Sequence, residues 1–187
     1  MNENILKRPY ISFHGIGDFN FLKLKSILEK GILPNVMLPD IKPRNELMGN
    51  TDTKVYLVKS PSLVGTDNAR AYKAYIQDSI AIAISKFPLD PNQSILNSFP
   101  DAGYLEGKIT PNSFIGITLP MEYYNRPLSE IPNDRLVTEE SEPLTSLVKD
   151  IIARYNTSGL PIYDSLRGER IDVIKKEIDN NDIDIEL

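Results

Sequence analysis

The sequence has no cysteine, no tryptophan and only one histidine among its 187 residues. Without cysteine the chain cannot form a disulfide, a thiolate metal site or a cysteine nucleophile. A single histidine also argues against a zinc site, because such sites usually combine several His or Cys ligands. A Ser-His-Asp system could be built only on His14. We therefore expect chemistry without a metal, and His14 is the residue to explain.

The sequence also lacks a long apolar run and an excess of positive charge. No segment approaches the roughly 18 apolar residues that a membrane span needs, and the opening MNENILKRPYISF has no apolar core of a secretory signal. The formal net charge of -5 argues against a broad nucleic-acid surface, because phosphate binding needs a basic footprint. We expect a cytoplasmic protein, or one secreted into a host cell without a classical signal peptide.

Several well-defined functional motifs are missing as well. The glycines of HGIG lack the rest of a dinucleotide fingerprint, and neither a P-loop nor a G-x-S-x-G elbow is present. Basic and aromatic residues are not interleaved in the way that suits single-stranded nucleic acid. Any functional residues must therefore belong to a pattern other than these fixed-spacing motifs.

The hydrophobic pattern of the chain is that of a globular domain with both strands and helices. Hydrophobic residues make up 41% and charged residues 25%, which is ordinary for a globular chain. Short apolar or alternating runs predict strands, and apolar residues at helical spacing predict helices. The predicted strands are 9–14, 54–60, 79–87, 102–109 and 113–120. The predicted helices are 20–31, a short helix that carries Ala71, Tyr72 and Tyr75, and then 141–155 and 169–178.

These elements do not alternate regularly between strand and helix as in a doubly wound sheet, so the expected class is α+β. Residues 1–187 would form a single domain, with a core at about 9–119 and a helical C-terminal extension at 141–187. The segment 34–53 has three prolines and no clear period. Long loops of this kind are often functional.

Four short motifs, in this order, resemble the ADP-ribosyltransferase fold of the diphtheria-toxin and poly(ADP-ribose) polymerase type. SFHGIGDFNFLKLKSILEKGILP is similar to the family's strand ending in His-Gly and the helix after it. KVYLVKSPS resembles a later strand with an aromatic residue, and NARAYKAY resembles a small-residue helix with a second tyrosine. GKITPNSFIGI is similar to the family's g-x-I-p-P-x-x-I-x-g-I element. The resemblance covers roughly residues 9–119 and implies a split pair of small antiparallel sheets flanked by helices.

The resemblance implies that NAD is the substrate and that a few residues bind it. His14 would donate a hydrogen bond to the adenosine ribose, and the Gly15 backbone would bind the nicotinamide amide, because a residue without Cβ permits close approach. Tyr56 and Tyr72 would stack on the nicotinamide ring, and Ser60 belongs to the same cofactor-binding set. We expect the rings of His14 and Tyr56 to face a common crevice shaped for a dinucleotide.

The resemblance also implies a carboxylate near the 2′-hydroxyl of the ribose. Bond breaking at C1′ gives an oxocarbenium-like state, which a preorganised carboxylate stabilises. Glu106 is one catalytic candidate, although the family's glutamate usually lies further ahead of the I-p-P element. Asp101 is the acid nearest the usual distance. Either could serve, or another residue such as Glu122 could.

Two functions from different classes follow from this resemblance. The first is NAD-dependent transfer of ADP-ribose to a macromolecular acceptor, expected to be a protein, by a bacterial effector or toxin. The second is a catalytically inactive interaction module on the same fold that binds a protein partner. An RNA phosphotransferase-like relative would want a basic cleft, which the net charge of -5 does not favour.

Each of these residues also has a purely structural interpretation. His14 could be a strand-end histidine bonded to backbone, Tyr56 and Tyr72 could be core aromatics, and Glu106 could be a solvated turn residue. Three arginines near the C-terminus could bind an anion or balance the acidic tail. They are Arg154, Arg167 and Arg170.

Overall fold

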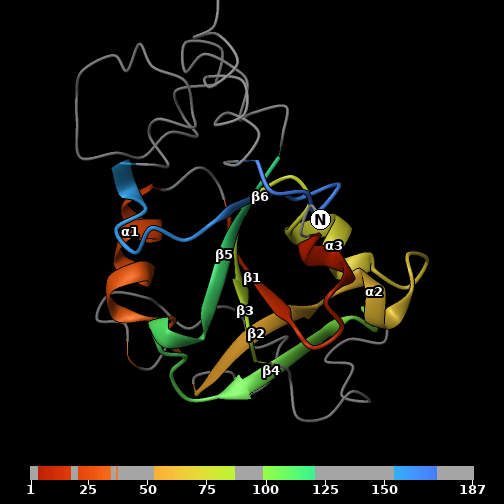
Figure 1. Ribbon diagram of the computed structural model, residues 1–187. Coiled ribbons are helices and arrows are strands. Elements are labelled where there is room, and N and C mark those ends of the chain that lie inside the picture. Colours follow the sequence, from red (N-terminus) through yellow and green to blue (C-terminus); the bar gives the residue numbers. More distant parts are fainter. Residues whose placement is uncertain are drawn as a thin grey trace, which may run out of the picture.

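A six-stranded sheet with helices on both faces organises the protein (Figure 1). The computed structural model describes residues 4–17, 21–34, 37, 53–86, 99–120 and 154–171. The strands are β1 (Ser12–Gly17), β2 (Lys54–Lys59), β3 (Ile80–Ile84), β4 (Ala102–Glu106), β5 (Phe114–Leu119) and β6 (Ile162–Asp164). The helices are η1 (Ile5–Lys7), α1 (Phe21–Lys30), α2 (Pro61–Val64), α3 (Arg70–Tyr75) and η4 (Pro111–Ser113).

The strand order in the sheet is β4-β2-β1-β3-β5-β6, and only the β5–β6 pair is parallel. A largely antiparallel sheet flanked by helices agrees with the predicted α+β class. The described strands do not form the predicted pair of separate small sheets, because β1 pairs with β2 on one side and with β3 on the other. β1 therefore joins both halves into one sheet.

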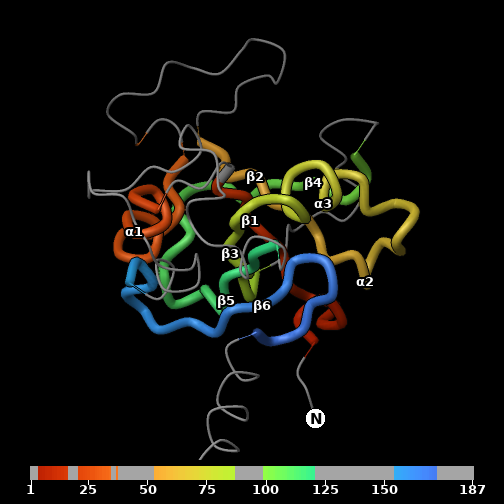
Figure 2. Tube along the Cα trace, turned by 90° about the horizontal axis from the view of Figure 1, so that it is seen from above, coloured from red at the N-terminus to blue at the C-terminus, as the bar shows by residue number. Residues whose placement is uncertain are grey.

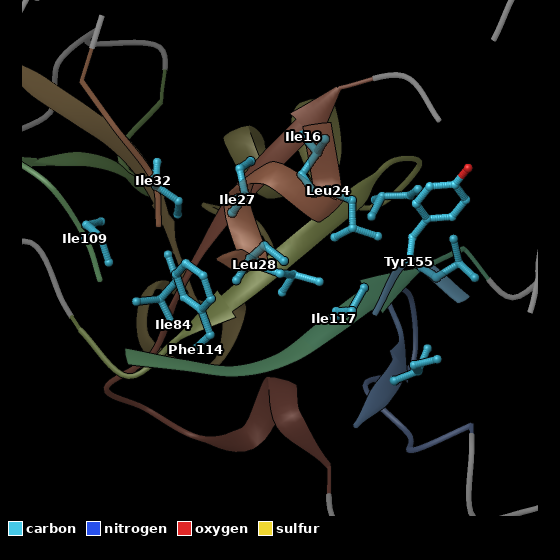
Figure 3. Close-up of a cluster of buried hydrophobic side chains, with 14 of the residues drawn as sticks. Ile16, Leu24, Ile27, Leu28, Ile32, Ile84, Ile109, Phe114, Ile117 and Tyr155 are labelled. Atoms are coloured by element: carbon cyan, nitrogen blue, oxygen red, sulfur yellow. The ribbon is translucent and has the colours of Figure 1, made fainter. Parts of the chain in front are cut away.

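Helix α1 covers one face of the sheet (Figure 2). Its apolar residues recur at helical spacing and are buried against isoleucines, leucines and valine of the strands. Figure 3 shows Leu24, Ile27 and Leu28 of α1 over Ile84, Phe114 and Ile117. The α1 residues in this core are Phe21, Leu24, Ile27 and Leu28. The helix prediction for 20–31 is confirmed, and Gly31 ends the helix in a left-handed conformation with φ of 87°.

Helix α3, together with α2 and η1, covers the opposite face (Figure 1). The alternating run of β3 explains how both faces are filled. Ile80, Ile82 and Ile84 point into the core under α1, whereas Ala81 and Ala83 point towards α3. The small alanines let α3 pack close to the sheet. The predicted division of large and small residues between the two faces is therefore confirmed.

The C-terminal part of the described chain differs from the prediction. β6 was not predicted, yet Ile162–Asp164 extends the sheet beside β5. Residues 169–171 were predicted to start a helix, but Arg170 forms an isolated bridge with Tyr163 instead. The rest of that predicted helix lies outside the described residues, as do Glu122, most of helix 141–155 and almost all of the 34–53 loop. None of the described helices is both long enough and apolar enough to cross a membrane.

Candidate functional site

The ladder between β1 and β2 ends next to His14. Their ladder pairs Ser12 with Lys59 and Phe13 with Val58, and no further pair follows. Hydrogen-bonded and non-bonded pairs alternate along an antiparallel ladder. The Ser60 N–H donates to the Ile11 carbonyl, so Phe13–Val58 is the next bonded position, and the one after it would join Gly15 to Tyr56. We call this point, where that pair is not formed, the fork.

The His14 side chain occupies the fork on the β2 side. Its Nδ1 lies 3.0 Å from the carbonyl oxygen of Tyr56. Because a carbonyl oxygen only accepts, Nδ1 carries the proton in the neutral ring and donates it to Tyr56. The other nitrogen, Nε2, then has a free lone pair and acts as an acceptor. The structure thus fixes both the orientation and the tautomer of the imidazole.

The imidazole is neutral over the physiological pH range. Burial lowers the pKa of His14 to about 4, which is more than the bond to the Tyr56 carbonyl can offset, and the positive charge of Lys23 lowers it further. Lys23 itself donates from Nζ to the carbonyl oxygen of Ile16 at 3.0 Å. The expected donor role of His14 towards a ribose is therefore corrected: Nε2 would accept a hydrogen bond from a hydroxyl.

The rings of His14 and Tyr56 lie on opposite faces of the sheet. His14 lies opposite Ile82, whose side chain is in the core under α1. Tyr56 lies between Val55 and Leu57 of that same core, so its ring points to the α3 face. The two residues meet through the Tyr56 carbonyl and not through their rings. The expectation that both rings face one crevice is therefore wrong.

Gly15 lies at the fork beneath the last turn of α3. A Cβ atom at this position would come 2.8 Å from the carbonyl oxygen of Tyr75 and 3.3 Å from Cδ1 of Ile76. Glycine is thus required here for close packing of α3. Its backbone N–H and C=O point towards β2, and they lie beyond the end of the β1–β2 ladder.

Tyr72 is a core residue and does not face a ligand ring. It is 3% exposed, its ring packs edge-on against Phe13 at 5.2 Å, and its hydroxyl donates to the carbonyl of Ser165 at 2.6 Å. Burial raises the pKa of Tyr72 far above its usual value, and the charge of Asp164 raises it further. The structural interpretation of Tyr72 applies, and its predicted role as a ring clamp does not.

Asp101 caps helix α3 from a distant part of the sequence. Its side chain is fully buried, and its two oxygens accept from the backbone N–H groups of Ala71 at 2.9 Å and Tyr72 at 2.8 Å. These are among the first N–H groups of α3, which have no partner within the helix. The residue that could hold this cap locally, Ala69, has no side-chain oxygen. Asp101 is therefore placed as a helix cap.

Glu106 is exposed at the far end of β4, which is an edge strand of the sheet. Its Oε2 accepts from the Thr53 hydroxyl at 2.9 Å. Standard strand spacing and rise put it roughly 14 Å from His14. Alternation along β4 places it on the α3 face with Tyr104, over whose ring Lys54 lies at 4.2 Å. The structure does not bring Glu106 and His14 together.

The other residues predicted from the sequence are Ser60 and the three arginines, and their described contacts are with the protein itself. Ser60 is buried and donates to the carbonyl of Leu6 at 2.8 Å, which ties the start of α2 to η1. Arg154 lies next to Tyr155, which stacks on α1, whereas Arg167 and Arg170 lie beside β6. No group of three or more His, Asp or Glu among the described residues could hold a metal ion.

The contribution of Ser165 could not be predicted from the sequence. This fully buried residue follows β6 and accepts from Tyr72 while its own hydroxyl donates to the carbonyl of Gln77. The motif IYDS begins with two apolar residues and is too short to predict a strand on its own.

Comparison with protein-family models, curated proteins and solved structures found no match to this chain.

Proposed function

We propose that the protein binds NAD at the fork between β1 and β2, and that it is an ADP-ribosyltransferase-like protein that transfers ADP-ribose to a protein acceptor. The observation that carries this proposal is the hydrogen bond between His14 Nδ1 and the Tyr56 carbonyl. That bond holds a neutral imidazole at the fork with Nε2 free to accept from a ribose hydroxyl.

The backbone at the fork suits the other end of the ligand. Gly15 turns its N–H and C=O towards β2, where the ladder has ended. A carboxamide offers one acceptor and two donors, so it can replace the missing strand pairing with Gly15. The ring of Tyr56 lies on the other face of the sheet from the His14 ring, so Tyr56 contributes the carbonyl that positions His14 and not a stacking surface. The site as proposed uses His14, Gly15 and Tyr56, and it does not use Tyr72 or Ser60.

The acid that a transfer reaction needs does not come from either described candidate. Asp101 is occupied as the cap of α3, and Glu106 lies on the far edge of the sheet. Transfer would therefore require a different acid. Glu122, which the sequence analysis named, is such a candidate.

Two conservative substitutions of His14 separate ligand binding from folding. In His14→Asn the amide nitrogen can still donate to the Tyr56 carbonyl, but the Nε2 acceptor is gone. We expect millimolar NAD to raise the Tm of the wild type by a few degrees, and NAD affinity to fall about tenfold in His14→Asn, the value of one hydrogen bond. His14→Gln keeps a polar group near Nε2 and loses the bond to Tyr56, so it should lose stability more than affinity.

Titration calorimetry of both variants, with ATP as a matched nucleotide, would test this expectation. Equal NAD affinity in the wild type and His14→Asn would remove His14 from the site. No stabilisation of the wild type by millimolar NAD would overturn the proposal as a whole.

The positions of Asp101 and Glu106 favour a second candidate function, a module that binds a protein partner and does not turn over NAD. Under this alternative, purified wild-type protein releases no nicotinamide from NAD, and Glu106→Gln changes nothing. Measuring nicotinamide release by chromatography distinguishes the two candidates. Release by the wild type that survives in Glu106→Gln would support transfer with an acid elsewhere, whereas its loss in Glu106→Gln would contradict the placement described above.

A further inference from the structure

Helix α3 is held over Gly15 by two segments that are remote in the sequence. Its last turn lies so close that a Cβ on Gly15 would meet the carbonyl of Tyr75 and the side chain of Ile76. The helix has only six residues. Helices of this length are not stable alone in water. The position of α3 therefore depends on contacts made by other parts of the chain.

One of these contacts is the Asp101 cap at the start of α3. The other is Ser165, which binds α3 and the residues just after it. Its carbonyl accepts from the Tyr72 hydroxyl at 2.6 Å, and its hydroxyl donates to the carbonyl of Gln77 at 2.5 Å. Its own N–H donates to Leu119 of β5 at 3.0 Å. Ser165 thus links the sheet to the end of α3 that covers Gly15.

Ser165 belongs to a short segment at the edge of the sheet, residues 160–171, which we call the strap. The strap lies beside η1 and α3 (Figure 2). Three of its residues pair with β5. A turn follows, in which the Gly168 N–H donates to the Asp164 carbonyl at 2.7 Å. The tip of the turn is open, with Leu166 61% exposed. Short edge elements open more readily than central strands.

We propose that the strap is a latch that controls access to Gly15. While Ser165 makes these hydrogen bonds, α3 stays packed against Gly15 and covers the fork from that face of the sheet. When Ser165 leaves, α3 loses the hydrogen bonds that tie Tyr72 and Gln77 to the strap, and its last turn moves off Gly15, which exposes the fork to a planar carboxamide. The ligand in this inference rests on the proposed function, but the coupling between Ser165 and Gly15 depends on the fold alone.

Two substitutions weaken the latch without changing the apolar core. Ser165→Ala removes the hydroxyl that binds Gln77, and Tyr72→Phe removes the hydroxyl that binds Ser165. Amide hydrogen exchange should become about fivefold faster in α3 and at residues 14–16 in each variant, the effect of losing one hydrogen bond. Ser85→Ala is the matched control, because its hydroxyl also donates to a backbone carbonyl, that of Ser113, at the other end of β3.

NAD affinity provides a second readout of the latch. If the open state is the one that binds, both variants should bind NAD about fivefold more tightly than the wild type and Ser85→Ala. Faster exchange in α3 with unchanged exchange at 14–16 would overturn the coupling. Coupled exchange with no NAD binding in any variant would support the latch and contradict the proposed function, so the two failures are distinguishable.

Discussion

Replacing Asp101 with alanine should lower the free energy of unfolding by about 3 kcal/mol. The substitution leaves the N–H groups of Ala71 and Tyr72 buried without an acceptor, and each unsatisfied buried donor costs about 1–3 kcal/mol. Asp101→Asn keeps one acceptor oxygen and should lose less. Urea denaturation monitored by circular dichroism measures both losses.

Glu106→Ala is the control for this prediction, because Glu106 is an exposed acid on the same strand. It should change the free energy of unfolding little. Equal losses in the Asp101 and Glu106 variants, or no loss in Asp101→Ala, would contradict the assignment of Asp101 as a helix cap. The cap has one further consequence: the Asp101 variants should lose stability whether or not NAD is present, which a purely catalytic residue would not do.

The second large effect concerns pH. His14 has a pKa of about 4 in the folded protein, compared with about 6.5 for an unperturbed imidazole. Between these values the unfolded chain binds a proton that the folded chain does not. Stability therefore falls as the pH is lowered from 6.5 to 4, by about 3 kcal/mol from this residue alone. Well above pH 6.5 the imidazole is neutral in both states, so the contribution no longer changes.

The pH prediction is tested by comparing the wild type with His14→Asn, which does not titrate in this range. The difference in unfolding free energy between the two proteins should shift by about 3 kcal/mol in favour of His14→Asn between pH 7 and pH 4. Other acidic groups titrate in both proteins and cancel in the difference. A constant difference over this range would show that the imidazole is not desolvated in the folded state.

Most of the central sheet could be predicted from the sequence because its signals are local. The Ile-Ala alternation at 80–84 predicts a strand with one large and one small face, and the apolar spacing at 21–30 predicts a helix. The short strand β6 could not be predicted, since three residues carry too little pattern. It forms because β5 offers an edge beside it, and that is a tertiary effect.

The candidate site could be predicted only in part, because its geometry also depends on contacts between distant parts of the sequence. The sequence singled out His14 and Gly15, which do lie together at the fork. It could not show that the two rings lie on opposite faces of the sheet, because that depends on the pairing register between β1 and β2, which the sequence does not give. Nor could it show that Asp101 caps α3 or that the Tyr72 hydroxyl donates to Ser165, because the partners in these hydrogen bonds are 29 or more residues apart in the sequence.

The hydrogen bond from Ile5 to the carbonyl of Gly168 joins the two ends of the described chain. During synthesis this hydrogen bond can form only after Gly168 has been translated, long after Ile5. The ribosome adds about 5–20 residues per second, so roughly 8–30 s pass between translation of these two partners. Throughout that interval the Ile5 N–H lacks the Gly168 carbonyl, and η1 is held by other contacts, such as the hydrogen bond from the Ser60 hydroxyl to the Leu6 carbonyl.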